Sequence, residues 1–392
     1  EPISSEYKKS EREKSEILRQ TVVGIDSVKV FSLESRQRFQ WRNAAAKSIH
    51  WYVKKTSHGN AGRAINAVLS QVMTVTIIFT GITLALAGSM SAGAIISCNM
   101  LGGKVTGPIK DINSFISELK TAVGIIDTIS DVWNAPMERA GSGGQRVMRG
   151  NFLLTDLGVS FKEKTALTKL TLEIKEFSRV GLVGPSASGK STLLRLFQGL
   201  VRPSTGSVTV DGVSFNNINI ANYRSQVALV NMDPTFFNGT IEDNLRRTRP
   251  NVSERDFTDA LEWSGLSLIM DQLPEGLSTH LDQSASELSK GHAMVVAIAR
   301  ALVSSPKILL FDEVFSPLDK KLQAHVLDNF DNITKGKTFL MASHDLKLIY
   351  KYDQLVVMDG GQLNGLGKHE ELLKTSALYN GLWNLETNLN SV

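Results

Sequence analysis

Polar and apolar positions follow different periods in successive parts of the chain. Residues 1–63 are rich in Lys and Arg and carry apolar residues at helical spacing, which predicts charged helices with a narrow apolar stripe. From Ala64 to Gly103 the sequence contains no Asp, Glu, Lys, Arg or His. From about Arg149, short apolar runs alternate with helical patterns, which is typical of an α/β domain with a largely parallel sheet.

The charge-free stretch is long enough for two membrane spans, because one spanning helix needs about 20 apolar residues. We expect these spans at about 65–87 and 91–109, with a turn that begins at Gly88. Arg63 and Lys104 flank them and predict that both outer ends face the cytoplasm. A buried hairpin of a soluble protein is the alternative. Polar residues in the first span either pack against other helices or line a polar path.

Composition changes this picture little. The net charge of +4 is small and the basic residues are spread along the chain, so we expect no nucleic-acid partner. A single cysteine, Cys98, excludes an intrachain disulfide, and the seven histidines show no metal-ligand spacing. The chain begins at Glu1 rather than Met and no signal peptide follows, which predicts a piece of a longer protein.

The strongest chemical signal is the segment 184–192, which fits the phosphate-binding pattern G-x-x-x-x-G-K-[ST] without a mismatch. Backbone N–H groups of such a loop point at phosphates, a lysine reaches the β- and γ-phosphates, and a hydroxyl ligates Mg²⁺. An apolar strand precedes the segment and a helix follows it, which is the required context. Its residues are Gly184, Pro185, Ser186, Ala187, Ser188, Gly189, Lys190, Ser191 and Thr192.

A second signal is the apolar run 308–311, which ends in two acids. We interpret it as a buried strand that delivers Asp312 to Mg²⁺ and Glu313 toward an attacking water. The alternative is that the two acids cap a following helix.

The region 149–392 resembles the ATP-binding-cassette (ABC) family. Residues 288–292 (LSKGH) stand where that family has its L-S-G-G-Q signature, and 297–302 (AIARAL) follow in the typical manner. Residues 316–319 (SPLD) resemble the family's D-loop, and Ser343-His344 resembles its switch histidine. Residues 233–241 (DPTFFNGTI) resemble the segment that follows the family's Q-loop. In the front part, residues 91–109 and 25–34 resemble the last membrane helix and a cytoplasmic extension of type I secretion exporters.

The resemblance implies an α-helical partial transmembrane domain (1–137), a linker (138–148) and an α/β P-loop nucleotide-binding domain of the ABC ATPase fold (149–392). It also implies a multi-pass protein of the inner (plasma) membrane, in contact with lipid, whose nucleotide-binding domain is cytoplasmic. A complete half-transporter has more membrane helices, so we expect the earlier ones to be missing from this chain.

In this family two cassettes meet head to tail, in a homodimer or a heterodimer, around ATP. The resemblance implies that Lys190 holds the phosphates, Ser191 and Asp312 hold Mg²⁺, Glu313 polarises water and His344 contacts the γ-phosphate. In the same way it implies that the ATP of the partner meets Ser289, Gly291 and Asp319. Type I secretion further implies a periplasmic adaptor and outer-membrane components as partners.

The sequence departs from the family pattern at Met232 in place of the Q-loop glutamine, at Lys290 and His292 in the signature, and at Glu163 near the adenine-stacking position. A thioether cannot supply the amide oxygen that helps to ligate Mg²⁺, and a carboxylate cannot stack on adenine. These changes predict an asymmetric pair. In such a pair, the phosphate loop of this chain, completed by an intact signature of the partner, hydrolyses ATP slowly. The ATP on the partner's loop, which faces the altered signature of this chain, is bound but poorly hydrolysed.

Three functions compete on this evidence. The first is an ATP-hydrolysing exporter subunit that moves a polypeptide or another substrate outward. The second is a catalytically impaired cassette that binds ATP and regulates a partner. The third is a soluble cassette that acts on nucleic acid or ribosomes, which the charge-free stretch and the single phosphate loop oppose.

Overall fold

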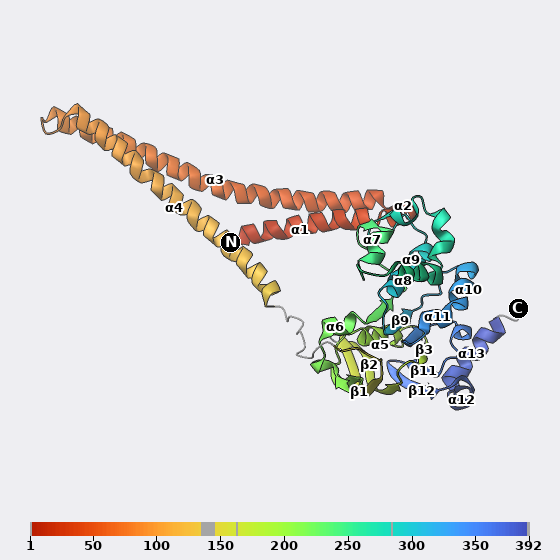
Figure 1. Cartoon of the computed structure of the whole chain (residues 1–392). Coiled ribbons are helices and arrows are strands. Elements are labelled where there is room, and N and C mark those ends of the chain that lie inside the picture. Colours follow the sequence, from red (N-terminus) through yellow and green to blue (C-terminus); the bar gives the residue numbers. More distant parts are fainter. Residues whose placement is uncertain (1, 135–145, 162–163, 284, 390–392) are drawn as a thin grey trace. The chain divides into compact units, whose positions relative to one another are not determined.

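The computed structural model describes residues 2–134, 146–161, 164–283 and 285–389. The chain forms two compact units, Glu1–Met137 and Glu138–Val392 (Figure 1). The described part of the first unit is helical, and every strand of the described residues lies in the second. This confirms the predicted fold class, a helical region followed by an α/β domain.

The helices of the first unit are α1 (Pro2–Val23), α2 (Ile25–Val30), α3 (Glu34–Leu86) and α4 (Ala92–Trp133). Helix α1 packs along the charged part of α3. The Lys47 ammonium lies 2.9 Å from the Glu13 carboxylate, and the rings of Tyr7 and Tyr52 lie 5.8 Å apart. The buried residues of these two helices are small and include Ala44 and the hydroxyl residues Ser10 and Ser48, which agrees with the narrow apolar stripe expected from the sequence.

Helices α3 and α4 each continue through a change in composition. Helix α3 contains both the charged residues up to Arg63 and the apolar stretch after it. Helix α4 continues through the glycines at 102 and 103. At Gly102 the missing side chain leaves room for close packing against α3. A Cβ atom there would lie 2.8 Å from Ile77 Cδ1 of α3 and 3.0 Å from Met73 Cε. The turn between the helices contains Gly88, with φ of +74°.

Among the described residues, one helical segment is long and apolar enough to span a membrane, Ala67–Leu86, with a mean hydropathy of 1.8. Only 6% of this segment is buried, which opposes the alternative of a buried soluble hairpin. In place of the predicted second span, the described residues give a shorter apolar stretch, Gly93–Gly102. That span therefore remains a prediction.

The second unit contains a six-stranded sheet, a four-stranded sheet and a two-stranded ribbon. The six-stranded sheet has the order β12-β11-β3-β10-β9-β6, in which β12 is antiparallel and the other neighbours are parallel. The four-stranded antiparallel sheet, β2-β1-β4-β5, is an element that the sequence analysis did not predict. The strands are β1 (Phe152–Phe161), β2 (Lys164–Ile174), β3 (Arg179–Val183), β4 (Thr205–Val210), β5 (Val213–Ser214), β6 (Val227–Val230), β7 (Gly239–Thr240), β8 (His280–Leu281), β9 (Ile308–Asp312), β10 (Thr338–Ala342), β11 (Gln354–Asp359) and β12 (Gln362–Gly367).

Helices cover these sheets and connect the parallel strands. They are α5 (Lys190–Phe197), α6 (Ile220–Arg224), α7 (Ile241–Arg246), α8 (Glu254–Ser264), α9 (Lys290–Val303), α10 (Lys320–Asp328), α11 (Phe330–Thr334), α12 (His369–Thr375) and α13 (Ala377–Leu389). Helix α9 has Ser289 as its N-cap, and its side chains from Ala293 to Ala299 are all buried.

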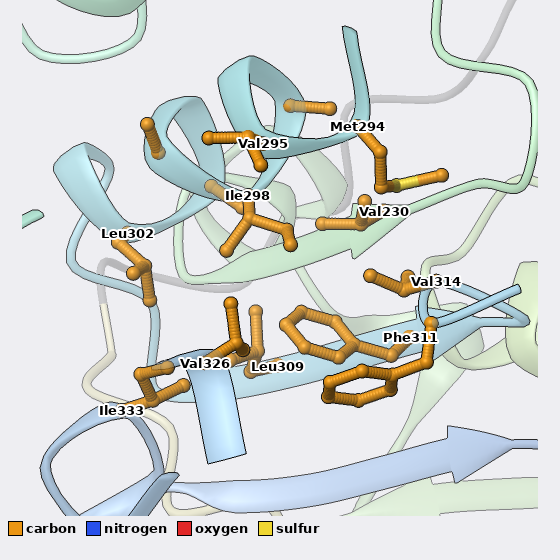
Figure 2. Packing of buried hydrophobic residues seen from close by; sticks show 14 of the residues in the cluster. Val230, Met294, Val295, Ile298, Leu302, Leu309, Phe311, Val314, Val326 and Ile333 are labelled. Carbon is orange, nitrogen blue, oxygen red and sulfur yellow. The ribbon is translucent and has the colours of Figure 1, made fainter. Parts of the chain in front are cut away.

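Strand alternation divides the core into two clusters on opposite faces of the parallel sheet. In β9, Leu309 and Phe311 join the cluster that includes α9, whereas Ile308 and Leu310 join the cluster that includes α5 and the antiparallel sheet. Figure 2 shows the first cluster, where α9 side chains such as Ile298 meet the strand. Because both faces are covered, the central positions of the parallel strands are apolar, and polar residues such as Asp312 stand at their ends.

We expect Phe311→Ala to lower the free energy of unfolding by about 3–5 kcal/mol, because it empties a fully buried site against the ring of Phe339. Urea titration with hydrogen exchange of β9 and β10 measures this loss. Leu153→Ala, at a 45% exposed position of β1, is the matched control and should change stability by less than about 0.5 kcal/mol. Equal losses for the two variants would contradict this account of the core.

Candidate nucleotide site

The candidate site lies at the carboxyl edge of three neighbouring parallel strands, β3, β10 and β9. The pairing Leu182–Ala342–Asp312 aligns the ends of these strands. The phosphate loop follows β3, the two acids stand at the end of β9, and His344 follows β10. Parallel strands place these segments together because all of them end at the same edge.

The backbone of the phosphate loop requires glycine at both of its ends. Gly184 and Gly189 have φ values of +151° and +101°, which L side chains rarely adopt. A Cβ atom at Gly184 would lie 2.2 Å from the Met358 carbonyl oxygen, and one at Gly189 would lie 2.7 Å from Leu167 Cδ2. The glycines therefore let the loop fold tightly before α5 begins at Lys190.

Lys190 is folded over the mouth of the loop. Its Nζ donates hydrogen bonds to the carbonyl oxygens of Gly184, at 2.7 Å, and Pro185, at 2.9 Å. The side chain is almost completely buried, and this burial lowers the pKa of its ammonium, while the carboxylates of Glu313 and Asp312 act in the opposite direction. An anion in the loop would compensate this buried charge.

Ser191 and Asp312, the predicted Mg²⁺ ligands, are in contact. Ser191 Oγ donates to Asp312 Oδ1 at 3.1 Å, although the residues stand far apart in the sequence. Burial raises the pKa of the Asp312 carboxyl, and the Ser191 hydrogen bond partly opposes this. Within the described part of the chain, no group of three His, Cys, Asp or Glu side chains could hold a metal. A hydroxyl and one carboxylate suit Mg²⁺, which takes its other ligands from phosphates and water.

Glu313 and His344 form a pair beside the loop. His344 Nε2 lies 2.9 Å from Glu313 Oε1, and both side chains are partly exposed. Glu313 has a φ of +55°, which is uncommon for a residue with a side chain. Its N–H donates to the Ala342 carbonyl oxygen at 3.0 Å, so the strained residue is tied to β10.

Lys190, Ser191, Glu313 and His344 line one cavity of about 580 Å³, a size typical of ligand sites. Asp312 is not a lining residue but contacts Ser191. Its lining residues are Phe161, Lys164, Thr165, Ala166, the loop residues Ser186 to Thr192, Glu313, His344, Gly360 and Gly361. Ser188 Oγ is buried there and has no hydrogen-bond partner among the described residues, so the loop leaves a polar group that a phosphate oxygen could satisfy.

The sequence analysis did not recognise Phe161 as a wall of this cavity. Its ring is 51% exposed, so it offers an aromatic face to a base. The signal was its place at the end of a strand, two residues before Glu163. Glu163, the predicted departure, lies outside the described residues.

The structure does not bring the predicted partner-facing residues into this cavity. Ser289 is the N-cap of α9 and accepts a hydrogen bond from the His292 N–H at 3.1 Å. Asp319 caps α10 in the same way, through the Leu322 N–H at 2.8 Å. Gly291 packs against the D-loop, where an added Cβ atom would lie 3.0 Å from the Pro317 carbonyl oxygen. None of the three is among the lining residues named above.

The other departures from the family pattern lie on the surface. Met232 is 48% exposed and stands after β6, and Lys290 is exposed at the first turn of α9. Neither side chain lines the phosphate-loop cavity. Lys290 places a positive charge at the positive end of a helix, which is unfavourable within the single chain.

Comparison with known proteins agrees with this geometry. Residues 167–316 match the family model described as "ABC transporter", so the second unit carries an ABC transporter domain. This match and the similarities below confirm the resemblance to ABC exporters of the type I secretion kind.

The chain is 31% identical to the cyclolysin secretion/processing ATP-binding protein CyaB of Bordetella pertussis, over 94% of the chain and 52% of that protein. It is 29% identical to the alpha-hemolysin translocation ATP-binding protein HlyB of Escherichia coli, over 94% of the chain and 53% of that protein. The chain thus spans about half the length of these relatives. A bacterial Atm1-family ABC exporter with ATP bound shares the fold, with a TM-score of 0.89, 23% identity and coverage of 98% of this chain and 70% of that one.

We expect Gly189→Ala to weaken MgATP binding by at least about tenfold, because the added methyl displaces the loop from Leu167. Calorimetric titration of the full chain with MgATP measures this. Gly212→Ala is the matched control, since its φ is +75° but the added atom meets nothing within 4 Å. It should cost about 1 kcal/mol of stability and leave affinity unchanged. Both variants introduce a side chain at a positive φ, but only Gly189→Ala crowds the loop. A similar loss of MgATP affinity in both variants would therefore contradict the explanation by crowding.

Asp312→Asn should stabilise the nucleotide-free chain at neutral pH by roughly 0.5–2 kcal/mol and remove the stabilisation by MgATP. Because burial raises the pKa of Asp312, its proton stabilises the fold below the unfolded pKa, and this contribution is lost as the pH rises through the folded-state pKa. The gain from Asn should therefore grow as the pH rises above about 4, the ordinary pKa of an aspartate carboxyl. Unfolding curves across this range, with and without MgATP, measure it; a gain that is constant with pH would refute the burial argument.

Proposed function

We propose that this chain is the ATP-binding and ATP-hydrolysing subunit of an ABC exporter. It couples closure of a cassette pair to outward transport of a substrate. The observation that carries the proposal is that Lys190, Ser191 and the Glu313–His344 pair line one cavity, with Asp312 in contact with Ser191. Phosphate binding, metal binding and water activation need these groups in one place.

In the proposed reaction, the phosphates of ATP lie along the loop N–H groups and the Lys190 ammonium. Ser191 and Asp312 hold Mg²⁺, which neutralises the charge that develops on the phosphates. Glu313 orients the attacking water and accepts its proton, and the contact with His344 fixes the carboxylate for that task. Phe161 packs against the base at the cavity wall.

The partner surface makes the proposed pair asymmetric. In a head-to-tail pair, Ser289 and Gly291 at the N-terminus of α9 close on the ATP of the second cassette. The exposed Lys290 and the changed His292 alter this surface, whereas the chain's own loop and its acids are intact. The pair then hydrolyses ATP mainly at the loop of this chain, if the second cassette is a different protein with an intact signature.

The transported substrate is proposed from the relatives. Their names describe secretion or translocation of cyclolysin, leukotoxin and alpha-hemolysin, which are polypeptides. For this chain we propose a polypeptide substrate, a multi-pass position in the inner membrane and a cytoplasmic nucleotide-binding domain. A periplasmic adaptor and outer-membrane components are the further partners proposed on the same basis. The exposed apolar segment Ala67–Leu86 supports contact with lipid.

Phosphate release by the full chain in lipid nanodiscs tests the proposal. The mixing partner is the chain with Lys290→Gly and His292→Gln, which restores the signature, and with Glu313→Gln, which silences its own site. We expect turnover in the mixture to exceed that of the unmodified chain alone by about 10- to 100-fold. The unmodified chain with Glu313→Gln, mixed with the same partner, is the control and should be inactive.

Two outcomes would contradict parts of this account. The first outcome is equal ATP turnover by the unmodified chain and by a chain that carries only Lys290→Gly and His292→Gln. This result would contradict the proposed asymmetry between the two sites. Binding of MgATP without turnover in any mixture would favour the second candidate, a regulatory cassette, for which the exposed Met232 at the Q-loop position is the supporting observation.

A further inference from the structure

The C-terminal helix α13 reaches the segment that carries His344. Figure 1 shows this helix in the second unit. It is held on the core by Tyr379, which is fully buried, and by the partly buried Leu382 and Trp383. On the same helix, the Glu386 carboxylate oxygen Oε2 accepts a hydrogen bond from the Leu346 N–H at 2.9 Å. The chain between these residues folds back, so a residue near the C-terminus touches the turn after β10.

That turn is the short segment 345–347. Asp345 organises it, because its N–H donates to Ser343 Oγ at 3.0 Å and its Oδ1 accepts from the Lys347 N–H at 3.0 Å. The Asp345 carboxyl and the Lys347 N–H also lie beside the Glu386 carboxyl, where the first raises its pKa and the second lowers it. The Leu346 hydrogen bond therefore ties the turn to α13.

The turn sets where His344 lies. Among the described residues, the polar partner of the imidazole is Glu313, and 48% of the His344 side chain is exposed. Few contacts therefore hold the ring itself, and its position depends on the backbone on either side. On one side β10 fixes Ser343, whose N–H donates to the Leu182 carbonyl oxygen. On the other side the 345–347 turn is the fixed point.

We propose that Glu386 is a positioning residue for His344 and acts through the 345–347 turn. This proposal rests on the proposed function only because its kinetic test measures ATP hydrolysis. Two carboxyl groups hydrogen-bond to each other only when one carries a proton, so the Glu386–Asp345 pair holds the turn in its protonated form. When both groups are ionised, they repel each other and the turn loosens.

The surroundings of Glu386 favour the proton. Burial raises the pKa of Glu386, and the Asp345 carboxyl raises it further, whereas the N–H groups of Leu346 and Lys347 lower it. The turn segment also carries the titratable residues His344 and Lys347, and α13 carries Tyr379, which is hydrogen-bonded to His369 of α12. As the pH rises through the raised pKa of Glu386, this carboxyl loses its proton, so the hydrolysis rate should fall.

Kinetics of the full chain in nanodiscs, with the signature-restored partner, test the proposal. Glu386→Ala should lower kcat by about 10-fold or more and leave KM for ATP within about twofold. Glu386→Gln should stay within about threefold of the unmodified chain, because the amide accepts from Leu346 and donates to Asp345 without a titratable proton. The Glu386→Gln variant should also lose the fall in rate with rising pH, because its amide does not titrate. Glu370→Ala, an exposed acid of α12, is the matched control and should change nothing.

A double variant separates positioning from general destabilisation. In a His344→Ala background, Glu386→Ala should lower kcat by less than about twofold further, because its effect passes through His344. An additive loss in that background, or a Gln variant as slow as the Ala variant, would overturn the proposal. Hydrogen exchange of residues 343–348 in the nucleotide-free chain gives a readout independent of hydrolysis. Faster exchange in Glu386→Ala supports the tie to α13 even if no variant hydrolyses ATP, and unchanged exchange overturns it.

Discussion

The parallel pairing of β3, β10 and β9 is the constraint on which the site depends. These strands end in register at Leu182, Ala342 and Asp312, so three loops from distant parts of the sequence meet at one edge. The sheet is buried on both faces, by α9 on one side and by α5 with the antiparallel sheet on the other. This rigid support fixes the candidate catalytic groups, since catalysis needs positions more exact than a free loop gives.

Several residues at this edge of the sheet are held in energetically unfavourable states. The Lys190 ammonium and the Asp312 carboxyl lie in places where burial disfavours their charged forms, and Glu313 holds a left-handed backbone conformation. The fold tolerates these costs because the two core clusters stabilise the strands that carry the residues. A phosphate chain with Mg²⁺ supplies the opposite charges, so the fold is prepared for the ligand at some expense of its own stability.

The sequence predicted the parts of this arrangement that depend on local signals. The phosphate loop follows from its pattern, and the strand ending at Asp312 follows from an apolar run that meets two acids. The pattern also marked Ser289 and Asp319, but in one chain both act as helix caps, since a motif does not state which partner its residues face. Phe161 and Glu386 escaped notice because their importance comes from packing between segments distant in the sequence. Composition does not mark the ends of α3 and α4, because each helix contains both a charged part and an apolar part.

The central claim is that the carboxyl edge of the parallel sheet binds MgATP through the buried Lys190. Calorimetric titration of the nucleotide-free full chain with MgATP, compared with Lys190→Ala, tests it most directly. The account predicts one site per chain in the unmodified protein and an affinity at least about 100-fold weaker in the variant. Equal affinity in the two proteins would contradict it, because the nucleotide would then be held elsewhere.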